Sequence, residues 1–199
     1  MTPRYGLFDV DCLEMNEQGD GLTFRPRVVP IIPLLGQLYH FGEAHNAPFV
    51  FCTCCSGSMP QPGVFEDVLH IPLDKSKQNW CAQVPDFRRF YLEKITYGDP
   101  KENAACRAFD VLGTNANGQK LFSLLKVDTW IVFGNGFDYC VGSAVKAMLA
   151  AGHKVILPQD VRISSAGGTP QSEEQTLAEM RAAGATITTL ADILAGIEA

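Results

Sequence analysis

The chain lacks long apolar runs, basic clusters and internal repeats, and these absences exclude several classes of protein. No segment approaches the ~20 consecutive apolar residues of a membrane-spanning helix. The first eleven residues lack the apolar stretch and the small-residue cleavage site of a signal peptide. The formal net charge is −6, and no run of Lys and Arg could follow a phosphate backbone. We therefore expect a cytoplasmic protein that binds neither a membrane nor nucleic acid.

The cysteines lack the regular spacing of a disulfide framework, and their number is odd. In a reducing cytosol their thiols stay free. A free cysteine there packs in the core, binds a metal or reacts, and its surroundings decide which. The seven residues are Cys12, Cys52, Cys54, Cys55, Cys81, Cys106 and Cys140.

Short apolar segments alternate with segments of helical spacing along the 199 residues. The apolar residues of segment 28–41 recur at helical spacing and end with Leu38 and Tyr39, although Pro30 and Pro33 interrupt its beginning. The pattern predicts strands at 5–10, 49–53, 90–95, 129–133, 155–157 and 186–188, and helices at 28–41, 111–125, 141–151, 173–183 and 190–196. Such alternation predicts one α/β domain over residues 1–199, with a central, mainly parallel sheet between two layers of helices.

In parallel sheets of this kind, ligands bind beyond the carboxyl ends of the strands. Three places in the sequence follow a predicted strand end and carry reactive or polar residues. They are Asp9, residues 52–56 and residues 134–140. We expect the functional residues at these three places.

Residues 134–140 read Gly-Asn-Gly-Phe-Asp-Tyr-Cys, between a predicted strand and a predicted helix. Backbone amides at a helix N-terminus have no partner within the helix, and the helix dipole there favours an anion. A thiol in this position loses its proton more easily, and the thiolate is the nucleophile. The same amides could hold the oxyanion of a tetrahedral intermediate. A cysteine packed under the sheet explains Cys140 equally well, so this segment alone leaves both interpretations open.

Two other residues could assist a nucleophile. A carboxylate at the position of Asp9 could accept and return a proton, although a lone Asp after a strand is more often a turn or cap residue. Lys94 could favour a thiolate electrostatically, although its neighbour Glu93 also suits an ordinary surface ion pair.

Segment 131–157 resembles the signature of isochorismatase-like cysteine hydrolases, a family that includes the nicotinamidase-related amidases. That signature is an apolar strand, Gly-x-x-Thr-Asp-x-Cys-Val, an Ala-rich helix ending in Gly, and an apolar strand leading to Asp. Segments 7–11 and 90–97 are similar to the stretches that carry the family's catalytic Asp and Lys, and segment 180–189 is similar to its last helix and strand. The signature positions here are Gly134, Asp138, Cys140, Val141, Gly152 and Asp160.

The resemblance implies the isochorismatase-like hydrolase fold and a catalytic triad of Asp9, Lys94 and Cys140. It also implies a cis peptide bond between residues 135 and 136, with the amides of Gly136 and Cys140 as oxyanion donors. Asn135 and Phe137 would then line the substrate pocket. The implied activity is a cysteine-dependent hydrolase that cleaves the C–N bond of a small amide or ureide through a thioester. We expect a homo-oligomer without a cofactor.

The sequence departs from the family pattern at several positions. Phe137 stands where Thr is usual. The family's Asp-x-His metal motif after the second strand is replaced by Cys54 and Ser56, and only His70 resembles the downstream ligand. Thiolate and imidazole suit zinc, so Cys54, Cys55 and His70 are weak metal candidates, but we expect no tightly bound divalent metal.

Two functions from other classes remain open. One is a catalytically weak relative that serves as a binding or assembly subunit, which the missing metal ligands and Phe137 favour. The other is a thiol redox protein that uses Cys52, Cys54 and Cys55. The reactivity of the thiols separates the three, because only a hydrolase requires one highly reactive Cys140.

Overall fold

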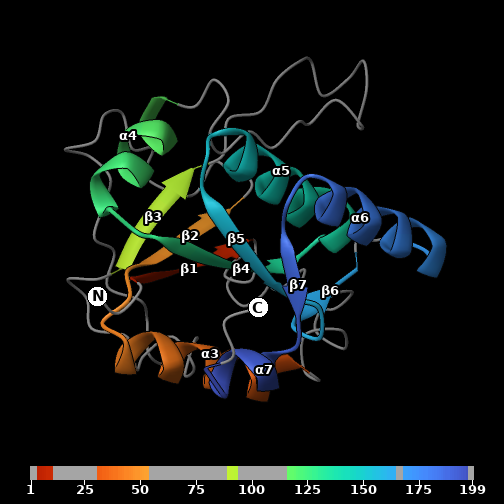
Figure 1. The fold of residues 1–199 in the computed structure, drawn as a ribbon, viewed down its shortest axis with the longest axis horizontal. Helices are drawn as coiled ribbons and strands as arrows, with labels where there is room; N and C mark the ends of the chain where they lie inside the picture. The colour runs from red at the N-terminus through yellow and green to blue at the C-terminus, as the bar shows by residue number, and fades with distance from the viewer. Residues whose placement is uncertain (1–3, 11–30, 54–88, 94–115, 165–167, 197–199) are drawn as a thin grey trace.

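A parallel sheet forms the middle layer of the molecule (Figure 1). The computed structural model describes residues 4–10, 31–53, 89–93, 116–164 and 168–196. The strands are β1 (Tyr5–Val10), β2 (Phe49–Thr53), β3 (Arg89–Glu93), β4 (Thr129–Asn135), β5 (Lys154–Pro158), β6 (Arg162–Ile163) and β7 (Thr186–Thr188). Their order is β3-β2-β1-β4-β5-β7, and β6 pairs with β4. Each of these pairings is parallel.

Helices cover both faces of the sheet, as Figure 1 shows. On one face lie α3 (Ile32–Ala44) and α7 (Leu190–Leu194). On the other lie α4 (Ala116–Leu125), α5 (Gly142–Ala150) and α6 (Pro170–Ala182). The predicted three-layer αβα architecture with a central parallel sheet is therefore confirmed.

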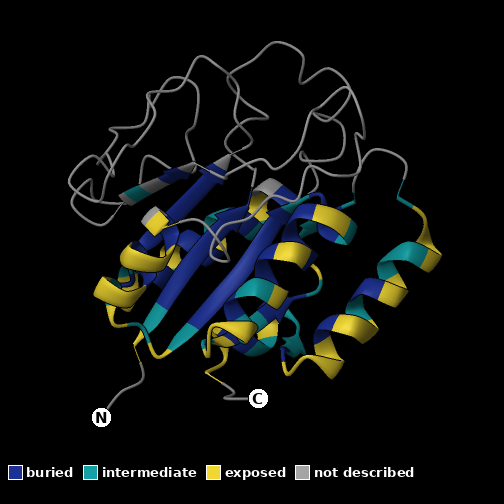
Figure 2. Cartoon of the chain, turned by 90° about the horizontal axis from the view of Figure 1, so that it is seen from above, coloured by how far each residue is buried: buried dark blue, intermediate teal, exposed yellow. Residues whose placement is uncertain are grey.

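The two helical layers enclose two hydrophobic clusters, because successive side chains of a strand point to opposite faces of the sheet. On β1, Leu7 belongs to the cluster under α3 and α7, which we call the α3-face cluster. Phe8 and Val10, which point to the other face, belong to the cluster under α4, α5 and α6, which we call the α5-face cluster. The central strands β1 and β4 are buried along nearly their whole length (Figure 2), which explains their continuous apolar sequences.

The predicted strands 5–10, 49–53 and 186–188 have the bounds that the sequence indicates. Strand 129–133 continues for two residues to Asn135, and strand 155–157 gains one residue at each end. Strand 90–95 begins one residue early, at Arg89, and its last two residues lie outside the described part. The two-residue strand β6 was not predicted, because so short a segment has no periodicity to detect.

The helix bounds differ from the prediction where proline or a capping residue sets the first turn. Helix α3 begins at Ile32 with Pro33 in its first turn, the position that proline tolerates in a helix. Helix α6 begins three residues before the predicted start, because Thr169 and Ser172 form a capping box around its N-terminus. Residues 111–115 of the predicted helix 111–125 lie outside the described residues. In the described part, no helix is long and apolar enough to cross a membrane.

Candidate active site

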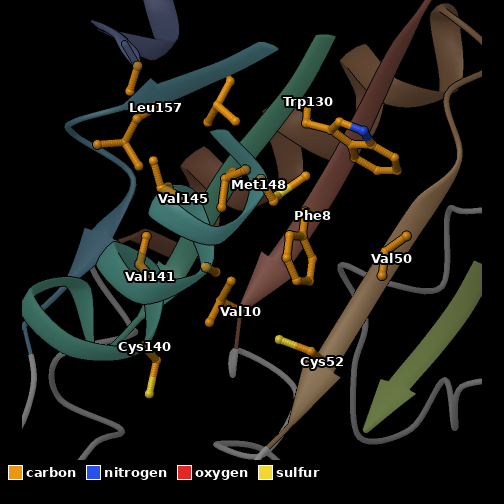
Figure 3. Packing of buried hydrophobic residues seen from close by; sticks show 14 of the residues in the cluster. Phe8, Val10, Val50, Cys52, Trp130, Cys140, Val141, Val145, Met148 and Leu157 are labelled. Atoms are coloured by element: carbon orange, nitrogen blue, oxygen red, sulfur yellow. The ribbon is translucent and has the colours of Figure 1, made fainter. Parts of the chain in front are cut away.

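Strands β1 and β4 are neighbours in the sheet, and their carboxyl ends lie at the same edge. Asp9 pairs in register with Phe133, and Val10 pairs with Gly134. The chain then leaves β4 and turns directly into the segment that carries Cys140. Figure 3 shows Val10, Cys52 and Cys140 together at this end of the α5-face cluster. The described parts of all three places predicted from the sequence therefore meet at one edge, namely Asp9, residues 52 and 53, and residues 134–140.

Two glycines allow the chain to turn sharply after β4. Gly134 has φ +141°, and a Cβ atom there would lie 2.0 Å from the backbone oxygen of Val10. Gly136 has φ +69°, in the left-handed region, and its Cβ would lie 3.4 Å from the Sγ atom of Cys140. The first glycine lets β4 approach β1 closely, and the second brings backbone without a side chain against the thiol.

Cys140 lies in a π-helical turn, Phe137–Val141, directly before α5. The carbonyl oxygen of Gly136 accepts hydrogen bonds from the amides of Tyr139 (2.9 Å) and Val141 (3.1 Å), and the second of these closes the wide turn. The cysteine retains 8% of its surface, while its neighbour Val141 is fully buried. Wide helical turns of this kind are frequent at functional sites, and the position before α5 gives a thiolate the favourable end of the helix dipole.

The peptide bond between Asn135 and Gly136 is trans, since the described residues contain no cis peptide bond. The prediction of a cis bond here is therefore wrong. Gly136 instead adopts the left-handed conformation, which turns the chain while the peptide bond stays trans. The Gly136 amide, predicted as an oxyanion donor, donates instead to Oδ1 of Asn135 at 2.8 Å. A substrate oxygen would have to replace the Asn135 side chain to reach this amide.

Asp9 is buried, with 2% of its surface exposed, and its Oδ2 atom accepts a hydrogen bond from the hydroxyl of Tyr39 at 2.5 Å. Tyr39 lies in α3 and belongs to the α3-face cluster. From the sequence, Tyr39 is expected only as part of an apolar helix face. Helical spacing predicts which face a residue occupies, but it does not show which strand residue its hydroxyl will meet.

The signature acid Asp138 connects the π-helical turn Phe137–Val141, which carries Cys140, to the beginning of α6. Its Oδ2 atom accepts a hydrogen bond from the hydroxyl of Ser172 at 2.8 Å. A Cβ atom on Gly168 would lie 2.8 Å from the same oxygen, so the chain before α6 lies directly against the carboxylate. These contacts give Asp138 a structural role between the π-helical turn Phe137–Val141 and α6.

Phe137 is fully buried in the α5-face cluster. The Arg162 guanidinium lies over its ring, 4.7 Å from the centroid, and forms an ion pair of 3.2 Å with Glu173. Glu173 also accepts a hydrogen bond from the hydroxyl of Ser164. The ring of Phe137 thus has no exposed surface, whereas Asn135 is partly exposed. That these two residues line the pocket stays a prediction.

The remaining predicted residues, Lys94, Cys54, Cys55 and His70, lie outside the described residues. Strand β3 ends at Glu93, which pairs with Thr53 at the end of β2, so the described chain stops one residue before Lys94 at the same edge of the sheet. Among the described residues, no three His, Cys, Asp or Glu side chains form a group that could hold a metal ion. The metal candidates and the role of Lys94 therefore stay predictions.

No family model matches the sequence, and no curated protein is significantly similar to it. Solved structures are similar over nearly the whole chain. One is an isochorismatase-like hydrolase from Alkaliphilus metalliredigens, with 17% identity, a TM-score of 0.64, and coverage of 98% of this chain and 99% of that one. The pyrazinamidase of Pyrococcus horikoshii, solved in complex with zinc, has 21% identity, a TM-score of 0.64, and coverage of 94% and 99%. The N-carbamoylsarcosine amidase of Thermoplasma acidophilum has 17% identity, a TM-score of 0.60, and coverage of 94% and 96%.

Identities this low establish a common fold and leave the activity open. The matches cover nearly the whole of this chain and of the similar chains, and the TM-scores reach 0.64. The chain therefore has the fold of the isochorismatase-like hydrolases.

Proposed function

We propose that the protein is a cysteine hydrolase that cleaves the C–N bond of a small amide or ureide. One observation carries the proposal. The buried carboxylate of Asp9 and the turn that bears Cys140 end neighbouring strands at one edge of the sheet. A thiol at a helix N-terminus and a carboxylate that can accept its proton are the groups that acyl transfer needs.

In the first half of the reaction, the thiol of Cys140 gives its proton to Asp9 and the sulfur attacks the substrate carbonyl. Lys94 supplies positive charge that favours the thiolate. The tetrahedral intermediate collapses when Asp9 returns the proton to the nitrogen, the C–N bond breaks, and the amine leaves. A thioester remains on Cys140.

In the second half, water attacks the thioester and Asp9 accepts a proton from that water. The C–S bond breaks, the carboxylic acid leaves, and the proton returns to the thiol. Asp9 thus serves as base and as acid in turn, which suits a carboxylate that a hydrogen bond holds in one orientation.

The oxyanion would accept hydrogen bonds from the amides of Gly136 and Cys140. In the resting protein, Oδ1 of Asn135 already accepts from the Gly136 amide at 2.8 Å. The side-chain oxygen therefore stands in for the substrate oxygen, and catalysis requires it to move away. Two of the similar structures are named as amidases, which supports an amide or ureide as the substrate class.

The test is release of ammonia from a panel of small amides and ureides. Cys140→Ala should abolish release from any compound that the wild type hydrolyses, because no other group forms the thioester. Cys52→Ala is the matched control, since Cys52 is a buried cysteine at the end of neighbouring β2, and it should retain the activity. Ammonia release that survives Cys140→Ala would contradict the proposal.

A second candidate is a catalytically weak relative that serves as a binding or assembly subunit. The observation that favours it is the hydrogen bond that the Gly136 amide donates to Oδ1 of Asn135. This bond occupies one of the two proposed oxyanion donors. Iodoacetamide labelling near neutral pH, followed by peptide mapping, separates the candidates. A hydrolase has one fast-reacting thiol at Cys140, a binding subunit has none, and a redox protein has a reactive pair among Cys52, Cys54 and Cys55.

A further inference from the structure

The hydroxyl of Tyr39 is the polar atom of an otherwise aromatic group beneath the sheet. Its ring is fully buried and stacks on Phe49, with centroids 5.1 Å apart and planes 9° from parallel. It also stacks on Phe51 at 6.1 Å and meets Phe133 edge-on at 6.2 Å. These contacts hold the ring through its faces and edges, and none of them needs the hydroxyl.

The same hydroxyl donates to Oδ2 of Asp9 at 2.5 Å. Phe51 and Phe133 are the residues that pair with Asp9 in register on the two neighbouring strands. The rings that hold Tyr39 therefore lie on both sides of Asp9, which is 2% exposed. A hydrogen bond to an ionised group is strong in such surroundings, and it both orients the carboxylate and stabilises its ionised form.

We propose that Tyr39 is a positioning residue of the active site, which holds Asp9 through Oδ2 so that proton exchange with thiol, amine and water occurs at Oδ1. This inference rests on the proposed hydrolase function. Tyr39 acts on the reaction through Asp9, whose Oδ2 atom accepts its hydrogen bond.

The hydrolysis of an acyl-enzyme isolates this effect. p-Nitrophenyl acetate transfers its acetyl group to the sulfur of Cys140 and releases p-nitrophenolate. Water then attacks the thioester, Asp9 accepts the proton of the water, and acetate leaves as the thiol re-forms. The thiol is acylated during this step and cannot titrate. The fall of the deacetylation rate at low pH therefore reports protonation of the carboxylate that activates water.

The test compares wild type, Tyr39→Phe and Tyr5→Phe. Tyr39→Phe deletes one oxygen and keeps the ring. Tyr5→Phe is the matched control, because it deletes a tyrosine hydroxyl at the other end of the same strand β1. Mass spectrometry follows the decay of acetylated Cys140 across pH. ¹³C NMR follows the carboxyl carbon of Asp9, which is assigned with Asp9→Asn.

In Tyr39→Phe, the midpoint of the Asp9 carboxyl titration should rise by about one pH unit, since a hydrogen bond to a charged group has this magnitude. The midpoint pH of the low-pH limb of the deacetylation rate should rise by the same amount. The plateau rate at higher pH should fall by about tenfold as the carboxylate loses its orientation. Tyr5→Phe should change neither. In wild type, the Cζ resonance of Tyr39 should respond at the pH where Asp9 takes up its proton, a measurement that needs no variant at position 39.

A carboxyl midpoint that does not move in Tyr39→Phe would overturn this inference and leave the proposed function standing. A midpoint that moves without a change in deacetylation would also overturn it, because the contact would then be structural only. If p-nitrophenyl acetate does not acetylate Cys140 in wild type, the proposed function fails and the inference fails with it. The carboxyl titration does not use the thiol, so these failures are distinguishable.

Discussion

At Gly134, the backbone of β4 passes so close to β1 that a Cβ atom would lie 2.0 Å from the carbonyl oxygen of Val10. The residue also has φ +141°, a conformation that side chains rarely adopt. The oxygen belongs to the backbone of Val10, and backbone geometry fixes the position of a Cβ atom, so neither atom can turn away as the end of a flexible side chain can. The position therefore accepts only glycine, and it lies six residues before the proposed nucleophile Cys140.

We expect Gly134→Ala to lower the free energy of unfolding by about 3 kcal/mol or more, because the strands must separate locally to admit the methyl group. Gly36→Ala is the matched control. Gly36 lies inside α3 and a Cβ atom there would have no neighbour within 4 Å, so alanine should raise stability by about 0.5–1 kcal/mol. Urea unfolding measures both values. Similar stabilities for the two variants would show that β4 and β1 are not this close.

The sequence indicated where Asp9 and Cys140 lie, since an acid near the end of one buried strand and a cysteine between another strand and a helix follow from hydrophobic patterning. The structure has both at these positions. The occupation of the Gly136 amide by Asn135 and the contact of Tyr39 with Asp9 could not be predicted. Each depends on how one side chain turns within its element, and residue spacing carries no information about that.

Among the elements, α7 shows how a short helix is held at the end of the chain. Its N-cap residue Thr189 and its third residue Asp192 form a capping box, and Thr188 of β7 donates a further hydrogen bond to Asp192. The hydroxyl of Thr189, and after it that of Thr188, lower the pKa of Asp192 below its ordinary value. The folded state therefore favours the ionised carboxylate.

A carboxyl group whose pKa is lowered by folding stabilises the protein above its unfolded pKa, which is about 3.9 for Asp. That contribution is lost as the pH falls through the lower folded pKa. Asp192→Ala should thus lower the melting temperature near pH 7, and the difference from wild type should shrink as the solution is acidified below about pH 4. Glu174→Ala, which removes an exposed acid of α6, is the control. A difference for Asp192→Ala that stays constant from pH 7 to pH 3 would contradict the assignment.

The elements themselves were largely predictable, because apolar runs and helical spacing reflect burial directly. The errors are local. Helix α6 starts early because a capping box outweighs the polar character of its first turn, and β6 is too short to have a pattern. This short strand nevertheless matters, since Arg162 lies on it and covers Phe137, the first residue of the π-helical turn that carries Cys140.

For the whole molecule, we expect that catalysis needs no tightly bound divalent metal, because Cys54 and Ser56 replace the Asp and His of the family's metal motif. Protein purified without chelator should contain less than one equivalent of zinc or iron, and EDTA should leave the rate of amide hydrolysis unchanged. Elemental analysis beside activity measurements provides the test. Stoichiometric metal whose removal abolishes activity would show that Cys54, Cys55 or His70 serve as ligands after all.

The proposed proton acceptor and the proposed nucleophile are supported from opposite sides of the sheet. Asp9 is held by Tyr39 of the α3-face cluster, while Cys140 belongs to the α5-face cluster. The sheet thus divides the proposed active site into two parts that meet at its edge. Substitutions that repack Phe49 and Phe51 would retune the basicity of Asp9, and substitutions that repack Val145 and Met148 would shift the thiol. Directed evolution could vary the basicity of Asp9 and the position of the Cys140 thiol in separate libraries and then combine the improved variants. Most pairs of changes would lie on different sides of the sheet, so their effects should add.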